Sequence, residues 1–257
     1  MVPVLRQPKY ITAETAILSV AGGEWKGTNV DQSDKTYIYN FIFPDGLRKI
    51  FRITLDHTAH YCNSSRGPWP EWTRLPHQQC PHCLLREKDS NHCPIAVNIA
   101  DLVASFQDIA SYKDCTVSCV SADRIVSKKT IVQDGLSSIM GIIMATSGCP
   151  TLDILRPMAW FHLPFASVDE SLFRSASTYL LRQYFEVQQG KQPDFPLERI
   201  KEHYLRIERV NHGMLERIRH ATVLDADRNA IVILNSLAQI LGMEVDENLE
   251  TLRPLFC

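Results

Sequence analysis

The sequence predicts an α+β fold, with a small antiparallel β part followed by a mostly helical C-terminal body. Apolar and polar residues alternate in two early segments, near 36–56 and 115–131. Apolar residues then recur at helical spacing through the C-terminal third of the chain. The 257 residues suit one large domain or two small ones. We expect a small β-hairpin region over 1–60, and a cysteine metal-binding loop with a helical domain over 61–257.

The two alternating segments predict β-hairpins. Near 36–56, the side chains expected on the buried face are Tyr37, Tyr39, Phe41, Phe43, Phe51, Ile53 and Leu55. Near 115–131, Cys115 and Cys119 share a strand face with Val117. Buried free cysteines behave as small hydrophobic residues, so we assign these two to the core.

Three helix starts in the middle of the chain are indicated by capping residues. Pro94 fits the first position of a helix over 94–109, which places Cys93 at the N-cap. Asp134 is expected to cap a helix over 135–146. Pro150 is expected to open a short helix that ends before Pro157, with Cys149 at its N-cap.

The C-terminal body is predicted to contain three long helices. Ser167 and Glu170 have capping-box spacing for a helix to about residue 189. The next helix, near 197–220, carries an apolar seam that includes Asn211, and we expect this seam to pack within the chain. The last runs from about residue 227 to 242.

Three cysteines predict a metal site. Cys80 and Cys83 form a C-x₂-C pair, the common half-site of zinc and iron–sulfur centres, and Cys93 follows. The segment over 57–93 has little periodicity, and a long irregular loop is usually functional or held by something other than packing. A redox dithiol is the alternative, but no βαβ pattern precedes the pair.

Cys149 is the candidate for the fourth ligand. Cys80, Cys93 and Cys149 are each followed by proline, which gives three Cys-Pro steps, whereas chance pairing predicts roughly 0.4. A sulfur at a helix start faces free N–H groups, which favours the thiolate. The rival ligands are His77, His92 and Cys62.

The metal is expected to be Zn²⁺ in a structural role, because closed four-thiolate sites are usually structural. The chain would then be a non-catalytic adaptor or regulatory protein. The alternative is an iron–sulfur redox or sensor protein, or an enzyme, that holds a [4Fe–4S] cluster with Cys149 as a reactive or exchangeable ligand.

No catalytic residue is predicted. Cys149 and His162 have the residue types of a thiolate–imidazolium nucleophile, with Asp153 or Arg156 nearby. A cysteine that binds a metal is not free to attack a substrate, so we favour structural hydrogen bonds for Arg156 and His162.

Charge and hydropathy limit the partners. The net charge is −2 and no long basic run is present, so a nucleic-acid partner is not expected. No segment has the roughly 18 apolar residues of a membrane helix, and residues 1–8 lack a signal-peptide pattern. We expect a cytoplasmic chain with a protein partner.

The phrases His77-Gln-Gln-Cys80-Pro-His-Cys83, His92-Cys93-Pro94 and Thr146-Ser-Gly-Cys149-Pro150 resemble an uncharacterised family of bacterial proteins. The likeness extends over most of the chain after residue 36 and includes a small β-hairpin module. No function is implied by it, but it suggests that the three Cys-Pro sites belong together.

Overall fold

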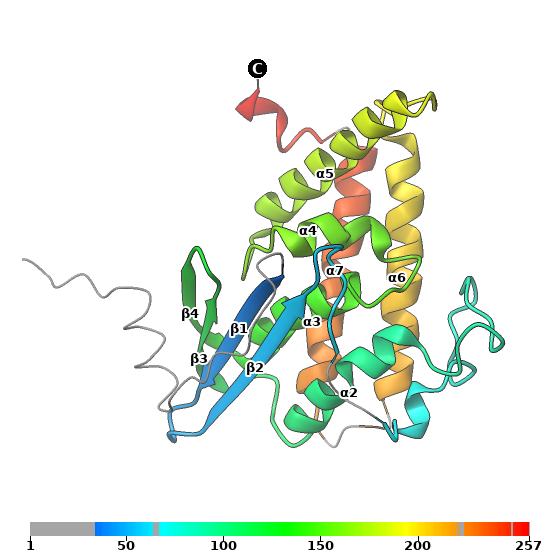
Figure 1. Ribbon diagram of the computed structural model, residues 1–257. Coiled ribbons are helices and arrows are strands. Elements are labelled where there is room, and N and C mark those ends of the chain that lie inside the picture. The colour runs from blue at the N-terminus through cyan, green and yellow to red at the C-terminus, as the bar shows by residue number, and fades with distance from the viewer. Residues whose placement is uncertain (1–33, 64–66, 220, 222–223, 248, 257) are drawn as a thin grey trace, which may run out of the picture.

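The computed structural model describes residues 34–63, 67–219, 221, 224–247 and 249–256. Residues 1–33, which are part of the expected region 1–60, lie outside the described residues. The α+β prediction is confirmed: a four-stranded antiparallel sheet precedes a mostly helical body (Figure 1). The strands are β1 (Lys35–Ile42), β2 (Arg48–Leu55), β3 (Asp114–Val120) and β4 (Ile125–Ile131).

Both predicted hairpins are present, and they join in one sheet with the order β2-β1-β3-β4. The central pairing is β1 with β3, in which Tyr39 lies opposite Cys119. The predicted alternation is confirmed, because Tyr37, Tyr39, Phe41 and Phe43 are all buried. The resulting core contains residues from both sides of the expected boundary at residue 60.

Two helices pack on the buried face of the sheet: α2 (Pro94–Phe106) and α3 (Val132–Ala145). Phe106 of α2 contacts the Phe41 ring, with 5.1 Å between centroids. Helix α3 lies so close to the sheet that a Cβ at Gly135 would be 2.5 Å from Cε1 of Phe41. A glycine is therefore required at this point of α3.

Two of the expected helix starts are wrong. Helix α3 begins directly after β4 at Val132, so Asp134 lies in its first turn, where it accepts a hydrogen bond from the Thr130 hydroxyl. No helix opens at Pro150. A 3₁₀ turn, η2 (Asp153–Leu155), leads instead into α4 (Arg156–Trp160), and Pro157 occupies the start of α4 rather than following a helix.

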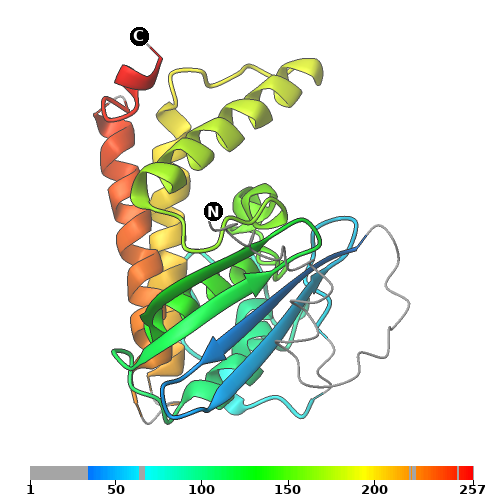
Figure 2. The same ribbon diagram turned by 90° about the vertical axis from the view of Figure 1, so that its left-hand side faces the viewer.

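The C-terminal body consists of α5 (Val168–Gln188), α6 (Glu198–Ile218) and α7 (Ala226–Asp246). The predicted capping box of Ser167 and Glu170 is present at the start of α5. Helices α6 and α7 run antiparallel and side by side, and α5 projects across their upper part (Figures 1 and 2). The α6 seam packs within the chain, and Asn211 is buried.

Two 3₁₀ turns complete the described elements: η1 (Glu71–Thr73), in the loop between β2 and α2, and η3 (Arg253–Leu255). Of the described helices, none combines the length and apolar character needed to cross a lipid bilayer.

Candidate metal centre

The structure brings the four predicted cysteines to one place. Cys80 and Cys83 come from the loop before α2, Cys93 from the N-terminus of α2, and Cys149 from the turn after α3. All four line a single small cavity, which is closed on another side by α6. Two neighbouring segments and a third, distant one at Cys149 therefore contribute cysteines to the same space.

A tight turn presents the C-x₂-C pair. The Cys83 amide donates a hydrogen bond to the Cys80 carbonyl oxygen, with 3.0 Å between nitrogen and oxygen. Burial, together with the nearby Cys93, Cys83 and Cys149, raises the pKa of Cys80 to about 11. Thiolates at these four positions would repel one another, and a bound cation would offset that repulsion.

Cys93 occupies the predicted N-cap of α2. Its amide donates to the Thr73 carbonyl oxygen at 2.8 Å, and its own carbonyl accepts from Val97 at 3.0 Å. The side chain is buried and makes no capping hydrogen bond to the helix. The backbone is therefore fixed on both sides while the sulfur remains directed to the cavity.

Cys149 is not at a helix N-cap, contrary to expectation. It begins a turn in which the Leu152 amide donates to the Cys149 carbonyl oxygen at 3.0 Å. Burial raises the pKa of the Cys149 thiol, while the amides of Leu152 and Thr151 act in the opposite direction by hydrogen bonding to it. Backbone N–H groups therefore do face this sulfur, although a turn and not an α-helix supplies them.

Arg217 of α6 is a residue of this site that sequence reasoning missed. Its guanidinium is buried and donates to the carbonyl oxygens of Trp72, Arg74 and Leu75, at 3.1, 2.6 and 2.8 Å. It also lines the cavity and lowers the pKa of Cys80. The available signal was a charged residue on the apolar seam of α6, three residues after Met214.

Gly213 is the second missed residue. A Cβ at this position would lie 2.8 Å from the Cys80 Sγ, closer than side chains approach one another. Helix α6 therefore needs a glycine where the Cys80 sulfur rests against it.

The rival ligands are placed elsewhere. Cys62 is exposed, and its Sγ contacts the carbonyl oxygen of His60 at 3.9 Å. The His92 ring is hydrogen-bonded through Nδ1 to the Thr73 hydroxyl at 2.8 Å. Neither these residues nor His77 line the cavity of the four cysteines. Cys115 and Cys119 are buried in the sheet, as expected.

The sulfurs do not have the spacing of a single-ion site as they stand. Over the described residues, no group of three His, Cys, Asp or Glu side chains is placed to hold one metal ion. The four cysteines thus share a cavity without meeting at one point, and metal binding stays a prediction.

The structure does not bring Cys149 and His162 together as a nucleophile and base. Cys149 lines the small cavity, whereas His162 lines a separate, larger one. The His162 ring is hydrogen-bonded through Nε2 to the Tyr39 hydroxyl at 2.5 Å. Arg156 forms an ion pair with Asp153 at 3.3 Å and contacts the His60 ring at 2.9 Å.

Fold and site together define an α+β protein with four cysteines gathered between a loop, two helix-flanking segments and a long C-terminal helix. Residues 37–257, which include the sheet, the four cysteines and the helical body, match the family DUF6901, described as a domain of unknown function. The chain belongs to that family. No curated protein and no solved structure matches it significantly.

Proposed function

We propose that this protein binds a metal centre through Cys80, Cys83, Cys93 and Cys149, and that the centre is structural. One observation carries the proposal: four cysteines from three separate segments line one cavity. The four donors are of one type, and thiolate sulfur is a preferred ligand of zinc and of iron–sulfur clusters.

The centre would hold the β2–α2 loop against the helical body. Between residues 67 and 93, the only regular element is the three-residue turn η1. Arg217 anchors the loop at residues 72–75, and the metal would anchor it at Cys80 and Cys83. Binding of structural zinc contributes on the order of 10 kcal/mol to folding in small peptides, enough to order such a loop.

Arg217 also fits the charge of the proposed centre. Four thiolates around a divalent ion carry a net charge of about −2. Burying this charge is unfavourable unless a cation lies nearby. The Arg217 guanidinium is only 1% exposed and lies at the cavity wall, where it would offset part of that charge.

Zinc is the first occupant that we propose, because closed four-cysteine sites are typical of structural zinc. A [4Fe–4S] cluster is the second, because thiolate sulfur is also its usual ligand. A cluster is larger than a single ion, so its thiols lie farther apart than the roughly 3.8 Å that a tetrahedron of 2.3 Å zinc–sulfur bonds requires.

Elemental analysis of anaerobically purified protein tests the proposal and separates the two occupants. About one zinc per chain with a colourless solution identifies the zinc site. About four irons per chain, with broad absorption near 400 nm, identifies the cluster. Cys149→Ser should lower the metal content, whereas Cys62→Ser, which alters an exposed thiol, should not. Protein without any metal, or full metal content in Cys149→Ser, would contradict the proposed ligand set.

An adaptor or regulatory role, with a protein as the partner, remains part of this proposal. Helix α5 exposes the large side chains of Phe173, Leu181, Tyr184 and Phe185, and exposed apolar patches often mark protein contacts. A photo-crosslinker at position 184 should capture a protein in cells, and one at Tyr112, which is more exposed and lies outside α5, serves as the control. Equal capture at both positions would argue against a contact surface on α5.

A further inference from the structure

A second, larger cavity lies among α3, α4, α5, α6 and α7, apart from the cysteines. Its volume is about 220 Å³. Protein interiors are close-packed, and voids much larger than a water molecule are few. An engineered cavity of about 150 Å³ holds one benzene molecule. By proportion, the cavity has room for a ligand of roughly nine non-hydrogen atoms.

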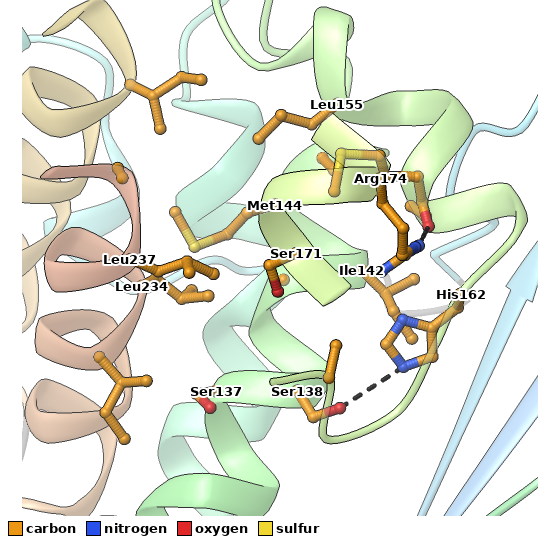
Figure 3. A pocket seen from close by; sticks show the side chains of 18 of the residues that line it. Ser137, Ser138, Ile142, Met144, Leu155, His162, Ser171, Arg174, Leu234 and Leu237 are labelled. Atoms are coloured by element: carbon orange, nitrogen blue, oxygen red, sulfur yellow. Dashed lines mark hydrogen bonds between the residues drawn. The ribbon is translucent and has the colours of Figure 1, made fainter. Parts of the chain in front are cut away.

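One wall of this cavity is apolar. Leu234 and Leu237 of α7 line it opposite His162, and Met144 of α3 and Leu155 of η2 extend the same surface (Figure 3). Such a wall suits a hydrocarbon or aromatic body, because burying apolar surface is favourable by about 25 cal/mol per Å².

The opposite wall is polar and carries a cation. Arg174, His162 and Ser138 lie together there, and a hydrogen bond joins the Ser138 hydroxyl to the His162 ring (Figure 3). Arg174 donates through Nη2 to the carbonyl oxygens of Met158 and Phe161, at 2.7 and 3.0 Å. Within the described part of the chain, its Nε and Nη1 donate to no other residue. Two directions of the guanidinium fork therefore remain available to a ligand.

The charges around the cavity are unequal at its two ends. Burial lowers the pKa of His162 to about 3, so this ring is neutral near pH 7. Arg174 is thus the one cation among the described lining residues. Asp134 is the one carboxylate among them, and it accepts a hydrogen bond from Thr130. Glu170, near Arg174, accepts from the Ser167 amide at 2.7 Å in the capping box.

We propose that this cavity binds a small monocarboxylate with an apolar body, such as a medium-chain fatty acid. The carboxylate would pair with the free donors of Arg174, since a planar guanidinium matches a carboxylate geometrically. One cation at one end favours a single negative charge. The body would lie against Leu234 and Leu237. Asn211, a buried residue with no hydrogen bond to another described side chain, also lines the cavity and offers a further polar contact.

Calorimetric titration of the full chain as purified tests this proposal with three probes of equal chain length: octanoate, 1-octanol and octylamine. We expect octanoate to bind with a Kd on the order of 0.1 mM, as the usual affinity per atom implies. Octanol should bind about tenfold more weakly and octylamine not at all. Equal binding of octanoate and octanol would show that the cavity is only apolar, and absence of octanoate binding would overturn the proposal.

Two variants locate the binding. Arg174→Gln should weaken octanoate by about tenfold and leave octanol unchanged, whereas Arg174→Lys should weaken octanoate less. Because Arg174 also anchors α4, Ser171→Leu provides an independent test: Ser171 is buried and lines the cavity, so leucine would fill the space. This variant should abolish octanoate binding while the melting temperature and metal content are kept. Octanoate affinity that is unchanged in Ser171→Leu would place the binding outside this cavity.

Discussion

Replacing Gly213 with alanine tests directly whether Cys80 is a fixed metal ligand. The new Cβ would lie 2.8 Å from the Cys80 Sγ, about 1 Å closer than a favourable contact. A free cysteine can relieve this overlap by rotating about χ1. A cysteine bound to a metal cannot rotate without losing the metal, so the overlap becomes a cost only in the metal-bound protein.

The expected magnitudes have opposite signs in the two forms. In the metal-free protein, alanine stabilises a helix interior relative to glycine by about 0.5–1 kcal/mol. In the metal-bound protein, overpacking adds a cost of about 1–3 kcal/mol. Because this cost arises only in the metal-bound protein, it weakens metal binding by the same free energy. Metal affinity should therefore fall by about 5- to 150-fold.

The matched control is Gly242→Ala in α7, where an added Cβ meets no atom within 4 Å. It should raise the melting temperature of both forms and leave metal affinity unchanged. The assays are chelator competition for zinc, or retained iron per chain for a cluster, together with melting temperatures of both forms. If Gly213→Ala binds metal as tightly as Gly242→Ala does, the Cys80 sulfur is not held against α6 and the ligand assignment fails.

Four further predictions concern cysteines, pH and assembly. Cys83→Ser should lose metal and melt at a lower temperature, and full metal content with unchanged melting would remove Cys83 from the site. The double variant Cys115→Ala and Cys119→Ala should keep its metal, because both thiols are buried in the sheet; metal loss would move the site there. Burial raises the pKa of Asp227 to about 7. The folded state therefore keeps a proton that the unfolded state releases near pH 4. The free energy of unfolding should fall by up to about 4 kcal/mol as the pH rises from 4 to 7. Asp227→Asn should abolish this fall in urea unfolding, and an unchanged pH profile would refute the assignment. Asn211→Leu should leave the mass in light scattering unchanged across concentrations, because the α6 seam is covered within the chain; a new oligomeric state would contradict that packing.

The local elements of this fold were predictable from short stretches of sequence. Alternation at Tyr37, Tyr39 and Phe41 predicted β1 and its buried face, because the side-chain period of a strand is two residues. Pro94 predicted the start of α2, and Ser167 with Glu170 predicted the start of α5, because capping depends on residues within one turn. After β4 the helix start was misplaced, because Asp134 lies in the first turn of α3 and bonds the Thr130 hydroxyl instead of capping the helix.

The gathering of the cysteines could be suggested by the sequence but was decided by the tertiary structure. The C-x₂-C pair is local, and the Cys-Pro steps marked Cys93 and Cys149 as related. Only the packing of α2, α3 and α6 brings these segments to one cavity, because contacts between distant segments depend on how whole helix faces fit. The same packing places Gly213 beside Cys80, which no local pattern contains.

The role of Arg217 and the presence of the larger cavity also could not be predicted from the sequence. The seam of α6 predicted which face of the helix is buried, but a buried arginine is explained only by the three carbonyl oxygens of the loop that it meets. The apolar seam near 197–220 likewise predicted that α6 packs within the chain. It does not determine whether the space between the helices is filled, because that depends on the summed shapes of side chains from five helices. Short-range patterns therefore predicted the strands, most helix starts and the related cysteines, whereas the spaces that these elements enclose depend on contacts between distant segments.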